Sequence, residues 1–247
     1  MCGIAGYLNR DGKPADAKIV AAMRDAIAHR GPDGKGLHLD GPLGLGHRRL
    51  SIIDLRTVAS QPMRSPDGRW TIVFNGEIYN FRELRQELER EGWIFRTRSD
   101  TEVLLAGATI WGVAQLARRI DGMAAFALWD ATERRLFLVR DRYGVKPLYL
   151  WRTAGRLAFA SEIKAFLAHP DFRVRVNEEA LREYFTFQNL FRPHTLFQGV
   201  EHLPPATILM IDDNGEKRHT YWDYDFAKPV AIEPEEAVSA LEKLMSQ

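Results

Sequence analysis

The only cysteine of the chain is its second residue, and this position makes it the strongest candidate for covalent chemistry. Methionine aminopeptidases remove Met1 when the next residue is small, so we expect the mature chain to begin at Cys2. The thiol would then share one residue with a free α-amine, and α-amines titrate at about 7.7 to 8.0. A nucleophile activated by its own N-terminal amine is a recognised solution to acyl transfer. A lone cysteine is more often a small buried hydrophobe, so position alone leaves both interpretations open.

The other residues that commonly carry chemistry form weaker patterns. The histidines have neither HxxEH nor HExxH spacing, so we expect no metal site in this chain. Gly44 and Gly46 form a GxG that lacks the third glycine and the following helix of a nucleotide-binding loop. The basic residues in RTRSDTE and ARRID are more typical of a solvated surface than of a docking site.

The composition indicates a globular protein with a large core. Of 247 residues, 45% are hydrophobic and 11% aromatic, while 34 basic and 33 acidic residues leave a formal charge of +1. Such a neutral chain has no surface made for nucleic acid or anionic lipid. No run approaches the roughly 18 to 20 apolar residues that cross a bilayer, and the start lacks the basic residues of an export signal. Because a single cysteine excludes an internal disulfide, we expect a cytoplasmic protein. From the near-neutral charge and the short apolar runs we expect small partners and no membrane or nucleic-acid role.

The elements that must position Cys2 are mostly predicted strands. The run CGIAGYL is expected to form a strand that ends at the Asp11–Gly12 turn. Apolar residues at helical spacing predict a helix over 14–29, followed by a loop at RGPDGKG. The runs LGLGHRRLSIID and WTIVF predict further strands.

Two helices follow with recognisable end signals. Asn80 is predicted to cap the first helix, with Glu83 completing a capping box and Gly92 ending the helix. Asp100 is predicted to cap the second helix, which runs to Gly112.

The second half of the chain is predicted to consist mainly of hairpins. They pair MAAFALWD with RRLFLVRD, PLYLW with RLAFAS, and TILMID with RHTYW, with short helices expected at 162–169 and 177–187. Because helices and strands do not strictly alternate, the pattern favours an α+β fold of two stacked sheets covered by helices over a doubly wound parallel sheet.

Eight further motifs follow one another along the chain. They are MCGIAGYL, HRGPDGKG, GHRRLSIIDL with QPM, FNGEIYNFRELRQEL, SDTEVLL, DGMAAFALWD, RDRYGVKPLY and FASEIKAF. Their order resembles that of class II glutamine amidotransferases, and over roughly residues 2–225 they most closely resemble the glutaminase domain of glutamine-hydrolysing asparagine synthetases. The resemblance implies the N-terminal nucleophile fold, a four-layer αββα sandwich of two mainly antiparallel sheets. It also implies an enzyme that hydrolyses glutamine to glutamate and ammonia.

The resemblance assigns the catalytic steps to Cys2, Asn75 and Gly76. The Cys2 thiol would attack the side-chain amide of glutamine, its α-amine would take and return the proton, and water would resolve the γ-glutamyl thioester. The side-chain amide of Asn75 and the N–H of Gly76 would hold the negative charge on the attacked oxygen, at about 3 to 4 kcal/mol per donor. Both follow the strand WTIVF, which offers a rigid support, and glycine permits close approach. Taken alone, these two residues are more typical of an ordinary Asn-Gly turn.

The resemblance also implies which residues bind glutamine. Arg49 would grip the substrate carboxylate bidentately, while Glu77 and Asp100 would contact the amino end. Arg48 is the rival of Arg49, because neighbours on a strand point to opposite faces; the motif selects Arg49. Asp100 could instead be only a helix cap. The predicted substrate-binding set is Arg49, Leu50, Ser51, Ile52, Ile53, Asn75, Gly76, Glu77 and Asp100, and the wall behind it is expected to include His29, Arg30 and Asp33.

We predict a glutamine amidotransferase domain over 1–226 and, over 227–247, a linker and the first helix of a synthetase domain. The SGGxDS loop of an ATP pyrophosphatase is missing from the sequence, so ATP and Mg²⁺ would belong to that other domain and this chain would hold no cofactor. The expected partners are L-glutamine and a synthetase domain or subunit that receives ammonia; a homodimer is left open. Two alternatives remain: a non-catalytic module that binds glutamine or supports another domain, and a stand-alone amidotransferase for another acceptor, such as a cell-surface sugar.

Overall fold

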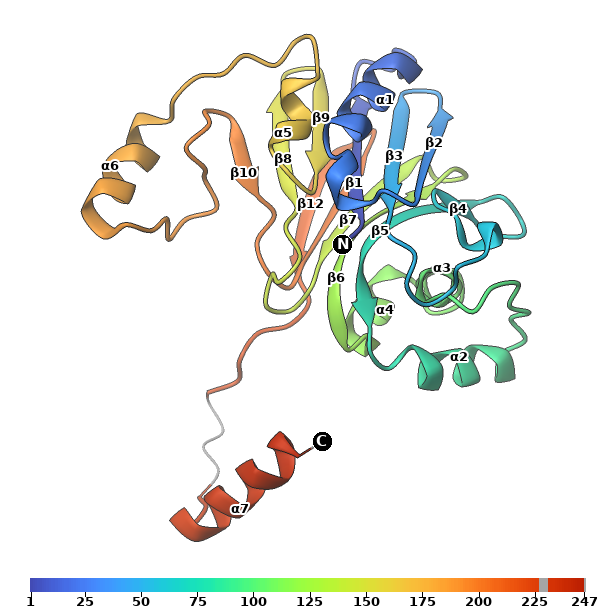
Figure 1. Ribbon diagram of the computed structural model, residues 1–247, viewed down its shortest axis with the longest axis vertical. Coiled ribbons are helices and arrows are strands. Elements are labelled where there is room, and N and C mark those ends of the chain that lie inside the picture. Colours follow the sequence, from blue (N-terminus) through green and yellow to red (C-terminus); the bar gives the residue numbers. More distant parts are fainter. Residues whose placement is uncertain (227–230, 247) are drawn as a thin grey trace.

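Two six-stranded antiparallel sheets form the centre of the computed structural model, which describes residues 1–226 and 231–246 (Figure 1). The first sheet consists, in spatial order, of β10 (Val200–His202), β8 (Tyr149–Thr153), β9 (Arg156–Ala160), β1 (Gly3–Asn9), β3 (Leu43–Arg49) and β2 (Gly34–Asp40). The second consists of β12 (Gly215–Thr220), β11 (Thr207–Asp212), β7 (Arg135–Arg140), β6 (Gly122–Asp130), β5 (Trp70–Ile78) and β4 (Met63–Arg64).

Helices cover the outer face of each sheet. The helices are α1 (Ala17–Ala26), α2 (Phe81–Arg90), α3 (Asp100–Ile110), α4 (Val113–Arg119), α5 (Lys164–Leu167), α6 (Glu178–Phe187) and α7 (Pro234–Met245), with 3-10 turns at Ala28–Arg30 and Thr57–Ala59. Helices α1 and α5 pack on the first sheet, whereas α2, α3 and α4 pack against the second (Figure 1). The predicted four-layer αββα sandwich is therefore confirmed.

Strand β1 is buried on both faces, which makes it a firm support for the residue before it. Ile4 and Leu8 face the core between the sheets, while Ala5 and Tyr7 face the core under α1. This alternation follows from the two-residue period of a strand. Because each face contacts a different core, all seven residues of β1 are buried.

One predicted helix cap is wrong, and the other is correct only in its position. Asn80 is the N-cap residue of α2, but its side chain makes no capping bond; it accepts the N–H of Asp121 and donates to the carbonyl of Arg119, each at 2.9 Å. Asp100 is the first residue of α3, and Ser99 before it is the cap, since its hydroxyl accepts a first-turn N–H at 3.4 Å. In both places a short polar side chain was free to bond elsewhere, which local spacing does not reveal.

Other boundaries differ where tertiary pairing overrides local propensity. The helix predicted over 14–29 begins at Ala17, behind an Asp16 cap that accepts an N–H at 2.7 Å. The end of the predicted RGPDGKG loop belongs to β2, which pairs with β3 along its whole length. Strand β3 stops at Arg49, so SIID is a loop and not a strand. Glycine-rich runs have weak strand propensity, and pairing with a neighbour decides their state. The three predicted hairpins are confirmed.

The C-terminal helix α7 has no buried residue among those described. Residues 227–230 of the predicted linker and Gln247 lie outside the described residues. Among the helices described, none is both long and apolar enough to cross a membrane.

Candidate active site

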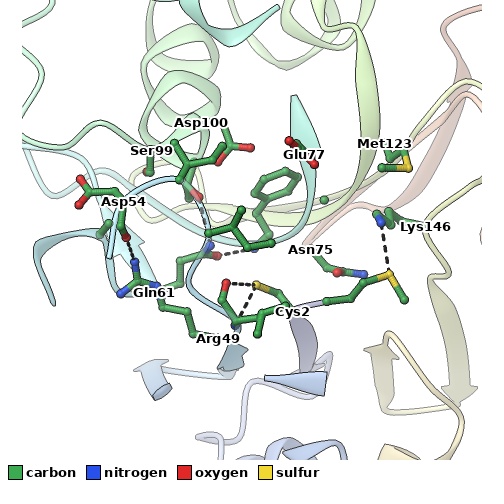
Figure 2. A pocket seen from close by; sticks show the side chains of 18 residues that line it. Cys2, Arg49, Asp54, Gln61, Asn75, Glu77, Ser99, Asp100, Met123 and Lys146 are labelled. Atoms are coloured by element: carbon green, nitrogen blue, oxygen red, sulfur yellow. Dashed lines mark hydrogen bonds between the residues drawn. The ribbon is translucent and has the colours of Figure 1, made fainter. Parts of the chain in front are cut away.

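One pocket of about 270 Å³ lies where the start of β1, the end of β3, the second half of β5 and the start of α3 meet (Figure 2). Nine of the ten predicted site residues line it: Cys2, Arg49, Leu50, Ile52, Ile53, Asn75, Gly76, Glu77 and Asp100. Ser51 is the exception, and its N–H donates to the carboxylate of Asp33 at 2.8 Å. The fold thus brings together residues from four separate segments.

Cys2 is held at its thiol by the Leu50 backbone and at its carbonyl by Arg30. Its Sγ lies 3.4 Å from the N and 3.5 Å from the O of Leu50, and the Arg30 guanidinium donates to the Cys2 carbonyl at 2.9 Å. Burial raises the pKa of the Cys2 thiol, although the Leu50 hydrogen bond acts in the opposite direction. A thiol with a raised pKa stays protonated at neutral pH, so it needs a base to remove its proton during attack.

Met1 lines the same pocket as Cys2. Its Sδ accepts a hydrogen bond from the Lys146 Nζ at 3.3 Å (Figure 2). While Met1 is attached, the nitrogen of Cys2 is an amide with no basic lone pair. Only removal of Met1 would turn this nitrogen into a basic amine.

The edge of β5 that faces the pocket is satisfied by side chains in place of a neighbouring strand. At Phe74 the N–H donates to Gln61 Oε1 at 2.6 Å, and the carbonyl lies 3.1 Å from His47 Nε2. Burial lowers the pKa of His47 to about 4, so this imidazole is neutral and its Nε2 carries the donated proton. Strand β4 pairs with β5 only at Ile72 and Thr71, which leaves this edge open.

Gly76 lies on the same open edge, two residues before Ile78, whose N–H donates to the Asp100 carboxylate at 3.2 Å. In a strand, residues two apart direct their N–H groups to the same side. On the other side, Gly76 pairs with Ala124, whose N–H and C=O bond to Asp141 at 3.2 and 2.8 Å. The Gly76 N–H therefore points away from β6 and toward the pocket.

The Asn75 side chain is buried at the pocket wall, with only 1% of its surface exposed. Neither its Oδ1 nor its Nδ2 has a hydrogen-bond partner among the described residues. A buried amide without partners costs about 1 to 3 kcal/mol, so such groups call for an explanation. Facing the same pocket as the Cys2 thiol, this amide can donate to an oxygen that enters it.

Arg49 and Arg48 point to opposite faces of β3, as the alternation requires. Arg49 lines the pocket and donates to the carbonyls of Arg56, at 3.1 Å, and Asp54, which leaves its remaining N–H groups for a ligand. Arg48 lies 3.5 Å from the carboxylate of Asp25 on α1. The structure therefore places Arg49 and not its neighbour at the pocket.

Two carboxylates lie at the α3 end of the pocket. Asp100 is buried, whereas Glu77 is exposed. Burial raises the pKa of Asp100 to about 6, and the charge of Glu77 adds to the effect. A cation bound between them would favour the ionised forms and relieve this penalty. The pair is thus suited to an ammonium group.

His29, Arg30 and Asp33, which were expected in the pocket wall, do not line the pocket. Arg30 binds the Cys2 carbonyl and, at 2.8 Å, Glu162, which also contacts His29 at 3.1 Å. Asp33 holds the N–H of Ser51 in the loop after β3. Their contacts support Cys2 and that loop.

Among the pocket residues outside the predicted set, Gln61, Asp54 and Lys146 were missed because they belong to motifs quoted only for their resemblance. Gln61 comes from QPM and supports β5, while Asp54 ends SIID and binds the Arg56 guanidinium at 2.6 Å. Lys146 comes from RDRYGVKPLY. Within the described part of the chain, no group of three or more His, Cys, Asp or Glu side chains could hold a metal ion.

Comparisons with known proteins agree with this geometry. The glutamine amidotransferase domain model matches residues 1–222. Asparagine synthetase [glutamine-hydrolyzing] 1 of Bacillus subtilis is 38% identical over 242 residues, covering 96% of this chain and 38% of the relative. A putative asparagine synthetase [glutamine-hydrolyzing] of Mycobacterium tuberculosis is 41% identical over 232 residues, covering 85% of this chain and 35% of the relative. The chain thus spans less than half the length of these relatives.

A solved structure supports the fold independently. Glutamine phosphoribosylpyrophosphate amidotransferase from Bacillus subtilis superimposes with a TM-score of 0.67 at 21% identity, over 90% of this chain and 49% of that chain. At this identity the likeness concerns the sandwich alone.

Proposed function

Because this chain belongs to the glutamine amidotransferase domain family, we propose that it hydrolyses the side-chain amide of glutamine through a thioester on Cys2. The family and the relationship to asparagine synthetases make it a glutamine amidotransferase enzyme. The proposal concerns the covalent route, the residues that carry it and the fate of the ammonia.

In the first half-reaction the Cys2 sulfur attacks the side-chain carbonyl carbon of glutamine. The free α-amine of Cys2 accepts the thiol proton, which the raised thiol pKa makes necessary. The carbonyl oxygen becomes an oxyanion. The α-amine then passes its proton to the amide nitrogen, the C–N bond breaks, and ammonia leaves a γ-glutamyl thioester.

Two donors are available for that oxyanion. The Asn75 amide has no other partner among the residues that the structure describes, and the Gly76 N–H on the open edge of β5 points into the same pocket. Preorganised donors cost no rearrangement when the charge develops, and each contributes about 3 to 4 kcal/mol to transition-state stabilisation.

The second half-reaction returns the enzyme to its starting state. Water attacks the thioester carbonyl, and the α-amine removes a proton from that water. The C–S bond breaks, the α-amine returns the proton to the sulfur, and glutamate leaves. The same base and the same two donors serve both halves.

Glutamine is held at its α-carbon end by charges of opposite sign. Arg49 binds the α-carboxylate through the guanidinium edge that faces the pocket, and Asp100 with Glu77 binds the α-ammonium. Leu50, Ile52 and Ile53 provide the apolar wall along the methylene groups.

The ammonia passes to an asparagine-synthetase-type domain or subunit. Support comes from the relatives, which are named asparagine synthetases and extend well beyond the part that this chain matches. ATP and Mg²⁺ would act in that partner, and L-glutamine is the ligand of this chain.

The observation that carries the proposal is a buried amide without partners, Asn75, in the same pocket as the Cys2 thiol. Its test is glutamate release from glutamine by the purified chain, with intact mass confirming removal of Met1. We expect release from the processed chain and none from Cys2→Ala processed in the same way.

Equal release by Cys2→Ala would exclude the thioester. No release from a processed chain that binds glutamine in a calorimeter would contradict the proposal and favour the non-catalytic module.

A further inference from the structure

The RDRYGVKPLY motif has no role in the chemistry assigned above, yet it builds a rigid loop beside the pocket. The Asp141 carboxylate accepts the N–H groups of Tyr143, Val145 and Lys146 at 2.9 to 3.1 Å. The Arg140 guanidinium donates to the carbonyl of Lys146 at 2.8 Å and to that of Gly144 at 2.6 Å. The loop that carries Lys146 is thus held from both sides by buried charged groups.

Lys146 itself is buried, with 7% of its surface exposed, and it lines the pocket. In the part of the chain that the structure describes, no carboxylate forms an ion pair with it, and its Nζ contacts only the thioether of Met1. A cation without a counter-ion is costly where water is excluded, so its place at the pocket wall calls for an explanation. Because Met1 covers the Nζ, removal of Met1 would leave this cation open to the pocket at the new N-terminus.

We propose that Lys146 is a positioning residue whose fixed positive charge keeps the α-amine of Cys2 unprotonated. A nearby cation disfavours protonation of an amine. The α-amine acts as a base only when neutral, so Lys146 extends its working range toward lower pH. The same charge disfavours ammonium in the pocket, which lets the product leave as ammonia. The inference rests on the proposed function.

The distance is short enough for a measurable effect. The Nζ lies 3.3 Å from the Met1 Sδ, and bond lengths place the Cys2 nitrogen within about 10 Å of the Nζ. At that separation, with the effective dielectric constant of a partly buried site, one charge changes an amine pKa by about one unit.

The other charged groups near the α-amine each have a partner of opposite charge when glutamine is bound, although two carboxylates share one ammonium. Arg30 contacts the Cys2 carbonyl but pairs with Glu162. Arg49 faces the substrate carboxylate, while Asp100 and Glu77 face the substrate ammonium. Lys146 is then the cation whose charge stays unpaired among the described residues that line the pocket.

The first test is the pH profile of kcat/KM for glutaminase activity in Lys146→Met and Lys146→Arg. Methionine keeps the length and removes the charge, whereas arginine keeps the charge. We expect the midpoint of the acid limb to move up by about one pH unit in Lys146→Met, a tenfold loss below the midpoint, and to stay in place in Lys146→Arg. Asp100 titrates on the same side but is common to both variants. Coincident profiles would overturn the proposal.

The second test measures the pKa of the N-terminal amine directly, in variants that do not turn over glutamine. In Cys2→Ala and in Cys2→Ala with Lys146→Met, ¹³C-methylation of the N-terminal amine allows its titration to be followed by NMR, after intact mass confirms removal of Met1. A midpoint about one unit higher in the double variant supports the role of Lys146 even if the wild-type chain releases no glutamate. Equal midpoints overturn that role even if it does.

Discussion

At the residue scale, two side chains give the most information about function, because their burial costs free energy in the absence of a ligand. Asn75 is buried with an unpaired amide, and Asp100 is buried with its pKa raised to about 6. Perturbed or unpaired polar groups gather at functional sites, because groups arranged for a ligand are costly without it. Both residues should therefore show opposite effects on stability and on activity.

Asn75→Leu tests whether Asn75 lowers stability while it supports activity at the proposed oxyanion position. Leucine has a similar shape and removes the unpaired amide, so the free energy of unfolding in urea should stay level or rise by about 1 to 3 kcal/mol. The kcat for glutamine should fall by about 100- to 1000-fold with the lost donor. An unchanged kcat, or a large loss of stability, would assign Asn75 a structural role.

Asp100→Asn tests the buried carboxylate through pH. Because the folded pKa of about 6 lies above the ordinary 3.8, the folded protein binds this proton more tightly than the unfolded chain. The charged form therefore destabilises the fold above pH 6, by up to about 3 kcal/mol, and this cost disappears as pH falls toward 4.

Without glutamine, Asp100→Asn should be more stable than wild type at pH 7 and equally stable at pH 4 in urea unfolding. Its KM for glutamine should rise. A variant that is less stable at both pH values would show that Asp100 acts as a structural acceptor for Ile78 and not as a ligand group.

At the element scale, the open edge of β5 decides where the site forms. Side chains of Gln61, His47 and Asp100 take the place of a neighbouring strand, and the Gly76 N–H between them stays available. The free N–H and C=O groups of an unpaired strand edge can pair with another strand. In this protein the unpaired edge of β5 faces a pocket instead.

Gly76→Ala tests this edge with a matched control. A Cβ at Gly76 would lie 2.0 Å from the Met123 carbonyl and 2.6 Å from the Phe74 ring, so β5 must shift, at about 1 to 3 kcal/mol of stability. We expect a lower thermal midpoint and a larger loss of kcat. Gly155→Ala, where a Cβ meets nothing within 4 Å, should change neither. Equal behaviour of the two variants would show that the edge tolerates displacement.

At the scale of the whole molecule, the sandwich contains its own cores and α7 adds none. The three hydrophobic clusters lie between the sheets and under the two helical layers, and α7 contributes no buried residue among those described. The domain boundary at residue 226 stays a prediction.

A chain that ends at Phe226 should therefore unfold at the same thermal midpoint as the full chain, because none of the described residues after 226 is buried. Differential scanning calorimetry of the two chains checks this. A midpoint several degrees lower in the shorter chain would mean that residues after 226 pack on the sandwich.

The sequence by itself determined the chemistry available and the class of fold. One cysteine beside the N-terminus, the Asn75–Gly76 pair after an apolar strand and a neighbouring Arg pair restrict the reaction to few types, and motif order indicates the sandwich. These conclusions depend on residue identity and local periodicity, which are properties of the chain alone. The catalytic and substrate-binding roles stay predictions.

Tertiary structure decided which groups meet and which stay unpaired. It separated Arg49 from Arg48, replaced the predicted Asp100 cap with Ser99, and showed the partnerless Asn75 amide. It also brought Lys146 to the pocket that contains Cys2. Each of these features depends on burial and on contacts between segments that are distant in the sequence. Spacing along the chain does not give these contacts, because hydrogen-bond partners and desolvation are decided only when the two sheets pack together.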